Sequence, residues 1–283
     1  MSILTIDPKA IEVPKLHHYL LGAIGPRPIC FASTIDAQGN RNLAPFSFFN
    51  VFSANPPIAV FSPARSGRTG DTKHTHDNVK EVPEVVINVV TYNMVHQMSL
   101  TSSPYDKGVD EFVKAGFTPI ASDLVKPWRV KESPVQMECK VIEVKELGDK
   151  GGAGNLIICE IVRIHIQEDV LNAQGQIDQE KIDLVARMGG NWYCRAHGEA
   201  LFEVDKPLTT RGIGFDNLPA TILNSTWLTG NDLGMLANVE ALPIVSEAAL
   251  ALYSTKTEEE KHQIAAQILR QGDVLQAWQV LLS

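Results

Sequence analysis

The sequence predicts a mainly β protein, an antiparallel barrel followed by a helical tail. Three observations predict this fold. Short apolar runs recur through the first two-thirds of the chain and are separated by turn residues. Two later runs alternate apolar and polar residues, which is the period of a strand with one buried face. From about residue 210 the apolar residues recur at helical spacing instead.

The first four strands are expected in apolar runs in the first third of the chain. These runs are residues 28–35, 43–53, 58–62 and 85–91. A turn-forming segment, residues 36–40, follows the first run, and Asn55-Pro56-Pro57 ends the second. Helical segments are expected outside these strands, at residues 72–81, roughly 92–100 and 110–115.

Residues 135–144 carry the clearest strand pattern. Apolar residues from Val135 to Val141 alternate with Gln136, Glu138 and Lys140, which predicts one buried face and one wet face. The apolar phase then slips by one residue, which predicts a β-bulge. A glycine-rich hairpin connection at 149–155 leads to a returning strand in which Val162, Ile164 and Ile166 alternate with polar residues. Strands of this kind joined by short turns indicate a closed antiparallel barrel.

The tail is expected to consist of helices. Thr257 and Glu260 fit a capping box, Gly272 can end that helix, and Asp273 can cap the next. The last helix carries an apolar stripe that needs a partner surface, formed by Val274, Trp278 and Leu281. We therefore expect two domains, residues 1–205 and 206–283.

Composition excludes several classes of protein. The 283 residues carry a net charge of -8, which argues against a nucleic-acid surface. The sequence has neither a signal-peptide pattern at its start nor an apolar stretch approaching the ~20 residues of a membrane helix. The four cysteines are scattered and the eight histidines lack metal-ligand spacing, so we expect neither a disulfide framework nor a metal site. A cytoplasmic protein with no nucleic-acid or membrane partner is the expectation.

Residues 67–79 are a candidate anion site. Asp71 or Thr72 is a suitable N-cap, which would place Lys73, His74 and Thr75 in the first helical turn. Free backbone N–H groups there favour an anion such as phosphate, and Arg65 and Arg68 lie just upstream. Taken alone, the segment fits an ordinary capped surface helix better, because capped helix starts with nearby lysines are common.

Residues 42–50 are a candidate wall for a flat ligand. Three phenylalanines lie beside Ser47 and Asn50, and apolar walls with a few fixed polar groups suit a heteroaromatic ring. Taken alone, the phenylalanines also fit core packing in a barrel strand. The nucleotide motifs are incomplete, since the glycines at 151–154 lack the full G-x-G-x-x-G pattern.

The order of the segments resembles a known family. PRPI (26–29), ST (33–34), a D-x-x-G turn (36–39), NLAPFSFFN (42–50), NPP (55–57), KHTHDN (73–78), DEF (110–112), ESP (132–134) and RMGGNWY (187–193) follow one another. In this order they resemble the flavin reductase-like family, over about residues 15–195. The resemblance implies a six-stranded Greek-key split barrel, with peripheral helices and, in this chain, a helical C-terminal extension. It also implies a homodimer with FMN bound non-covalently near the subunit interface.

The resemblance also implies the residues that bind FMN. The family's K-D-T-x-x-N phosphate motif corresponds here to Lys73, Thr75 and Asn78, with His74 replacing the aspartate, and Arg65 is an additional phosphate contact. The residues implied near the isoalloxazine ring are Ser33, Thr34, Phe46, Ser47, Asn50, Ser62 and Tyr193, with Gly189 and Gly190. The resemblance gives no role to the tail beyond residue 205.

Three functions follow from the resemblance. The first is an NAD(P)H-dependent flavin reductase, in which hydride passes to FMN and the reduced flavin serves a monooxygenase, a metal complex or a redox protein. The second is a flavoredoxin-like electron carrier that takes electrons from a protein donor. The third is a non-enzymatic FMN-binding protein whose tail binds a partner. Hydride transfer requires no acid–base side chain, so no catalytic residue is assigned.

Overall fold

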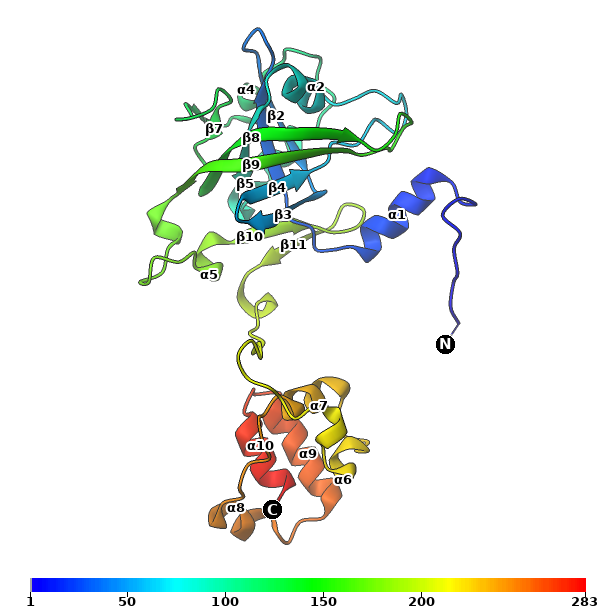
Figure 1. The fold of residues 1–283 in the computed structure, drawn as a ribbon, viewed down its shortest axis with the longest axis vertical. Helices are drawn as coiled ribbons and strands as arrows, with labels where there is room; N and C mark the ends of the chain where they lie inside the picture. The colour runs from blue at the N-terminus through cyan, green and yellow to red at the C-terminus, as the bar shows by residue number, and fades with distance from the viewer. Residues whose placement is uncertain (1) are drawn as a thin grey trace. The chain divides into compact units, whose positions relative to one another are not determined.

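A computed structural model describes residues 2–283, which form two compact units. The first unit extends to Phe202, and the second runs from Glu203 to Ser283. The main sheet belongs to the first unit, and the last five α-helices belong to the second (Figure 1). Within residues 2–283, no helix is both long enough and apolar enough to cross a bilayer.

One antiparallel sheet of seven strands forms the first unit. The strands are β1 (Cys30–Ile35), β2 (Arg41–Phe46), β3 (Phe49–Ala54), β4 (Pro57–Phe61), β5 (Glu84–Val89), β8 (Val135–Glu146) and β9 (Asn155–Ile166), in the order β2-β1-β5-β8-β9-β4-β3. The two edge strands, β2 and β3, are consecutive in the chain and only Ser47 and Phe48 separate them. Because two residues span only about 10 Å between strand ends, the sheet must curl until its edges meet. The predicted antiparallel barrel is thus confirmed. It has seven strands rather than six. The single predicted run 43–53 is interrupted at Ser47 and Phe48, where the chain passes from one edge of the sheet to the other without reversing its direction.

The β8–β9 hairpin confirms the predicted bulge. The register between the two strands shifts between Glu138 and Cys139 and again between Val141 and Glu143. The wet face predicted for β8 is wrong at two positions, because Gln136 and Glu138 are 4% and 0% exposed. The segment around β6 (Pro119–Ile120) and β7 (Arg129–Val130) covers them, with backbone N–H groups bonded to Glu138. The predicted apolar face of β9 is also only partly buried, since Ile164 is 51% exposed.

Two apolar clusters lie on opposite faces of the sheet. The interior cluster includes Phe61, Ile87 and Ile157, together with the three buried cysteines. The outer cluster, which includes Phe31 and Phe112, packs under the peripheral helices. These are η1 (Tyr92–Met94), α3 (Val95–Leu100) and α4 (Glu111–Ala115), as the sequence predicts.

Several short elements lie outside the sequence prediction. They are α1 (Val13–Ala23), η2 (Glu168–Val170), α5 (Gln179–Ile182), β10 (Leu184–Arg187), β11 (Tyr193–Ala196) and η3 (Gly198–Ala200). Every side chain of α1 is exposed or half-buried. In Figure 1, α1 and the β10–β11 pair lie at one end of the barrel, and helix α2 (His74–Glu81) lies at the other.

The second unit is a small helical bundle. Its elements are η4 (Phe215–Asn217), α6 (Ala220–Leu223), α7 (Gly230–Ala237), α8 (Glu247–Tyr253), α9 (Glu258–Leu269) and α10 (Val274–Leu281). The predicted capping box of Thr257 and Glu260 is present, and Asp273 caps α10. Gly272 has a φ of 83°, a left-handed conformation that favours glycine and ends α9. Trp278 of the predicted stripe is completely buried in the bundle's own apolar core.

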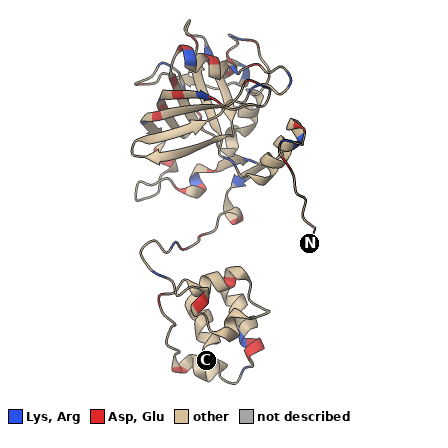
Figure 2. Cartoon of the chain, turned by 45° about the vertical axis from the view of Figure 1, so that its right-hand side comes forward, with Lys and Arg blue, Asp and Glu red and all other residues tan. Residues whose placement is uncertain are grey.

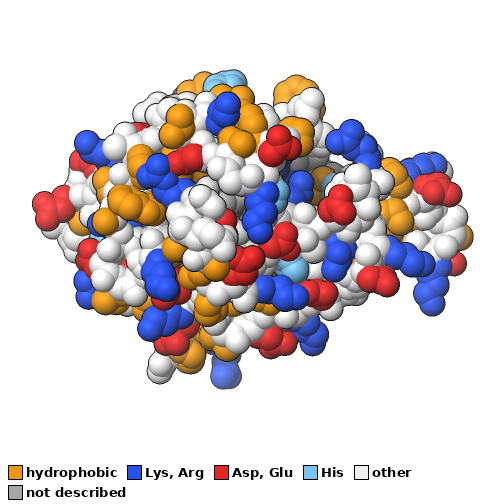
Figure 3. Space-filling view, turned by 90° about the horizontal axis from the view of Figure 1, so that it is seen from above, with side chains coloured by type: hydrophobic (Ala, Val, Ile, Leu, Met, Phe, Trp, Pro, Cys, Tyr) orange, Lys and Arg blue, Asp and Glu red, His pale blue; other side chains and the backbone are white. Residues whose placement is uncertain are grey.

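Charged residues are distributed over both units (Figure 2). On the face of the molecule seen in Figure 3, acidic and basic side chains are interspersed. That face therefore presents no broad patch of a single sign.

Candidate functional site

Helix α2 begins one or two residues later than the sequence predicts. Its N-cap is Lys73, whereas Asp71 or Thr72 was expected. The Thr72 hydroxyl donates to the Asp77 carboxylate, at 2.7 Å, and accepts no backbone N–H of α2 within residues 2–283. Lys73 is exposed, and its ammonium makes no hydrogen bond or ion pair with any residue from 2 to 283. The first-turn N–H groups and this free cation lie at the same end of α2.

A buried polar network fixes α2 on the barrel. The Asn42 side-chain amide donates to Thr34 Oγ1 at 3.1 Å and to Thr75 Oγ1 at 2.9 Å. Asn78 Nδ2 also donates to Thr34 Oγ1, at 3.2 Å. All four side chains are at most 7% exposed. The structure therefore brings together three predicted site residues, Thr34, Thr75 and Asn78, and adds Asn42, which the sequence analysis did not single out.

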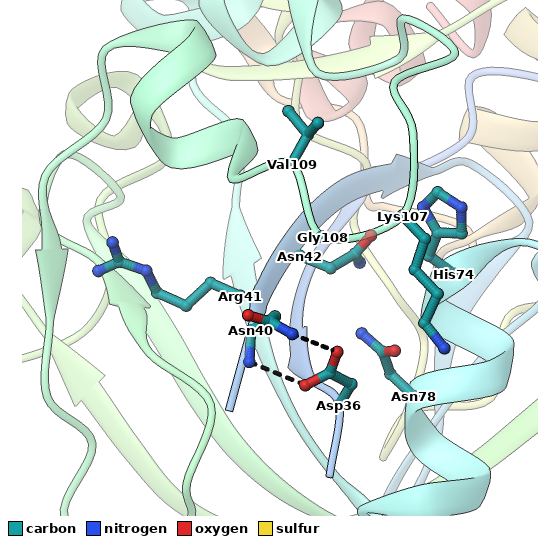
Figure 4. Close-up of a pocket in the computed structure, with 9 residues that line it drawn as sticks. All are labelled: Asp36, Asn40, Arg41, Asn42, His74, Asn78, Lys107, Gly108 and Val109. Atoms are coloured by element: carbon teal, nitrogen blue, oxygen red, sulfur yellow. Dashed lines mark hydrogen bonds between the residues drawn. The ribbon is translucent and has the colours of Figure 1, made fainter. Parts of the chain in front are cut away.

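A small hollow lies beside this network (Figure 4). It has a volume of about 10 Å³, and its lining includes His74, Asn78, Asn42 and Lys107. That volume holds about one water molecule. Figure 4 shows the side chains of Lys107 and His74 close together at its edge, with Asn40 bonded to Asp36 on the other side. Because a phosphate group is larger, any phosphate near α2 must lie on the exposed side of the helix start.

The loop before α2 is held by the end of the β8–β9 hairpin. The Arg65 guanidinium donates to the Gly148 and Gly70 carbonyls and pairs with Glu146 at 3.4 Å. The buried Ser62 hydroxyl accepts from the Asn155 backbone N–H at 3.0 Å. Arg65 and Ser62 therefore anchor the loop, whereas the Arg68 guanidinium makes no side-chain contact of this kind within residues 2–283.

Strand β2 connects this end of the barrel to the other predicted residues. Asn42 lies beside Thr75 near the start of β2, and Phe46 and Ser47 lie at and after its end. Four to five residues of strand span about 13–17 Å. Phe46 is half-buried, and its ring lies 5.7 Å from that of Phe61. Asn50 is exposed on β3, whereas Ser33 is completely buried and its hydroxyl has no partner among residues 2–283.

Arg27 connects α1, β2 and β10 although it is only 5% exposed. Its Nη1 donates to the Leu21 and Ile24 carbonyls, and its Nη2 donates to the Met188 carbonyl at 2.9 Å. Its Nε donates to the Ser47 hydroxyl at 3.4 Å. Burial, and secondly the charge of Arg187, lower the pKa of this guanidinium.

Arg187 and Tyr193 are cross-strand partners at the loop end of the short β10–β11 pair. They are paired in the β10–β11 register, and the Arg187 guanidinium lies 4.6 Å from the centre of the Tyr193 ring. Gly189 packs so closely on α1 that an added Cβ would lie 3.2 Å from the Gly22 Cα. The sequence analysis named Tyr193 and the glycines but neither arginine, although both stand inside the motifs PRPI and RMGGNWY.

A separate ionic cluster lies on the outer face of β8 and β9. Ligand atoms of Asp123, Glu138 and His165 lie within 4.8 Å of one another. The carboxylate of Glu138 accepts three backbone N–H groups, from residues 123–125, and contacts His165 Nε2 at 2.7 Å. Asp123 pairs with Arg163 at 2.8 Å. Because these oxygens already have internal donors, we interpret the cluster as the anchor of the segment that covers β8.

Comparison with known proteins places the barrel in a family. Residues 23–181 match the flavin reductase like domain. An uncharacterised protein of Aquifex aeolicus is 36% identical over 197 residues, which are 69% of this chain and 97% of that protein. Nitrilotriacetate monooxygenase component B from Bacillus cereus superposes with a TM-score of 0.67 at 30% identity, covering 72% of this chain and all of that one. A split-barrel-domain protein from Shewanella frigidimarina gives a TM-score of 0.60 at 29% identity, covering 70% and 95%. The chain thus has the split-barrel fold and belongs to the flavin reductase-like family.

Proposed function

We propose that this protein is an FMN-binding oxidoreductase that passes hydride from NADH or NADPH to the flavin. The proposal rests on membership of the flavin reductase-like family and on the positions of possible phosphate-binding and ring-binding groups along β2. A free lysine and the start of α2 lie near the beginning of the strand, and an aromatic and polar wall lies at its end. The span of about 13–17 Å between them suits a ribityl phosphate chain with its fused ring.

The residues present fit FMN. Within residues 2–283, uncommitted donors for a phosphate are the side chains of Lys73 and Arg68 and the backbone N–H groups of His74 and Thr75 at the start of α2. Helix starts favour such an anion. We assign Thr34, Thr75 and Asn78 to holding α2 in place for this contact, and Arg65 and Ser62 to holding the preceding loop. Phe46, Ser47, Asn50 and Tyr193 are available to the ring.

When bound, the flavin supplies the redox chemistry, because it accepts a hydride. The chain's own residues bind the phosphate, orient the ring and limit its contact with water. The reduced flavin would then serve a monooxygenase or a redox protein, and the name of the Bacillus cereus relative supports a monooxygenase partner.

Loss of the Lys73 ammonium tests the phosphate assignment. In Lys73→Ala we expect FMN binding to weaken by about 1.5–3 kcal/mol, the scale of a lost charge-assisted contact. This corresponds to a roughly 10- to 150-fold higher dissociation constant, measurable by quenching of flavin fluorescence. Lys80→Ala is the matched control, because Lys80 lies at the other end of α2 and pairs with Glu146. Equal affinities for FMN in wild type and Lys73→Ala would refute the assignment.

We also propose that the protein is a homodimer formed through the barrel. The edge strand β3 exposes Val51 and Phe52, which are 50% and 70% exposed, and α1 exposes Leu20 at 51%. Large exposed apolar residues on an edge strand favour association. Light scattering after size exclusion should give the dimer mass for wild type and the monomer mass for Phe52→Glu. Leu275→Glu changes a similarly exposed residue of the second unit and should remain dimeric. A monomeric Leu275→Glu variant would indicate that the dimer interface includes the helical tail.

A further inference from the structure

Two arginines at one end of the barrel lack an anionic partner. Neither Arg27 nor Arg187 forms an ion pair with a carboxylate of residues 2–283. They are nevertheless neighbours, since their backbones form an antiparallel bridge with N–O distances of 2.9 and 2.8 Å. Buried charges in proteins are normally paired, and two adjacent cations repel each other. The two positive charges would therefore favour an anionic ligand beside them.

The two guanidinium groups differ in what they can still bind. Arg27 uses both Nη1 hydrogens, one on Nη2 and the one on Nε, so four of its five N–H groups are committed. The Arg187 guanidinium donates only to the Trp192 carbonyl, at 3.2 Å, among residues 2–283. Arg187 thus has free donors for a ligand, and Arg27 adds a fixed second charge behind it.

The surroundings select a flat ligand. The Tyr193 ring lies against the Arg187 guanidinium, and Ser47 accepts from Arg27. Gly189 brings the backbone close to α1, and Gly190, which follows it, is exposed. An aromatic face, two cations and a backbone with little side-chain bulk together suit a planar ring that bears negative charge.

We propose that Arg187, supported by the charge of Arg27, binds the anionic reduced form of the flavin and favours it over the neutral oxidised ring. Hydride transfer adds one proton and two electrons to the oxidised ring and leaves it with one negative charge, while the nicotinamide becomes oxidised. A positive charge near the ring stabilises that product and raises the reduction potential. This inference rests on the proposed function, because it requires FMN to occupy the site.

The test measures how tightly each redox form is held. The dissociation constant for oxidised FMN and the midpoint potential of the bound flavin are determined for wild type, Arg187→Gln and Arg187→Lys. In Arg187→Gln we expect reduced FMN to lose about tenfold more affinity than oxidised FMN. For this two-electron couple, that ratio equals a midpoint potential lowered by about 30 mV. Arg187→Lys keeps the charge and should recover most of the difference.

Arg195→Gln is the matched control. Arg195 lies on the neighbouring strand and is already paired with Asp183 at 2.7 Å, so its loss should leave the potential unchanged. A folded Arg187→Gln variant with the wild-type potential would overturn the proposal. So would an equal loss of affinity for both redox forms, because that is the result of a merely structural role. A wild-type protein that binds no FMN would instead refute the proposed function itself.

Discussion

Replacing Glu138 by glutamine is expected to lower the free energy of unfolding of the barrel by about 2–4 kcal/mol. Glu138 is completely buried, and its two oxygens accept the backbone N–H groups of residues 123–125. A glutamine amide would direct N–H groups at some of these donors and would leave them without an acceptor. Chemical denaturation measures the loss, and hydrogen exchange should show the three amides unprotected. Glu160→Gln, an exposed change on β9, should alter stability by less than about 0.5 kcal/mol.

The same carboxylate predicts a dependence of stability on pH. Burial raises the pKa of Glu138, but hydrogen bonds from the Asp123 backbone and from His165 outweigh it, so the pKa lies below its ordinary value. A carboxyl group with a lower pKa in the folded chain stabilises the fold above its unfolded pKa of about 4.3. That contribution is lost as the pH falls through the folded value. Glu138→Gln should therefore lose less stability than wild type on acidification below about pH 4.3, and parallel curves would contradict this account.

Truncation of Trp278 to alanine is expected to destabilise the helical unit by about 3–5 kcal/mol. The indole is completely buried, and its Nε1 donates to the Leu236 carbonyl at 3.2 Å. A unit of about 80 residues is typically stable by about 4–12 kcal/mol, so the change removes a large part of its stability. Because the unit has its own core, calorimetry should show one transition lowered and the barrel transition unchanged.

An exposed tryptophan of the same unit provides the control for Trp278. Trp227 is 47% exposed, so Trp227→Ala should cost less than about 1 kcal/mol. FMN binding should be the same in Trp278→Ala and in wild type. A single transition that falls for the whole chain, or loss of FMN binding, would show that the barrel depends on the helical unit.

The strands and helix caps that could be predicted are those that depend on residues close together in the sequence. The phase slip in β8 is visible in the order of its apolar residues, and the capping box of α9 depends only on Thr257 and Glu260. The β10–β11 pair was missed because its position depends on contacts far away in the chain, such as the bridge from Arg27 to Arg187. Glu138 was expected to face water for the same reason, since the segment that covers it precedes β8 and has no strong pattern of its own.

The candidate site, too, could be predicted from the sequence only in part. Motif order led to the prediction of Lys73, Thr75 and Asn78 as phosphate-site residues. The structure places Lys73 at the N-cap of α2 and Thr75 and Asn78 within the helix. Motif order could not show which of the predicted side chains already have hydrogen-bond or ion-pair partners within the protein. Arg65 and Lys73 are both cations near the start of α2, but only the structure shows that Arg65 is held by Gly148, Gly70 and Glu146.

The central claim is that this chain binds FMN and accepts hydride from a nicotinamide. The most direct measurement is the absorption spectrum of the purified protein after incubation with FMN and removal of excess, followed by anaerobic addition of NADH and then NADPH. We expect the flavin band near ~450 nm to remain with the protein and to bleach promptly with one of the two donors. Bound flavin that neither donor reduces would contradict the reductase and favour an electron carrier, and a protein that retains no FMN would contradict the whole account.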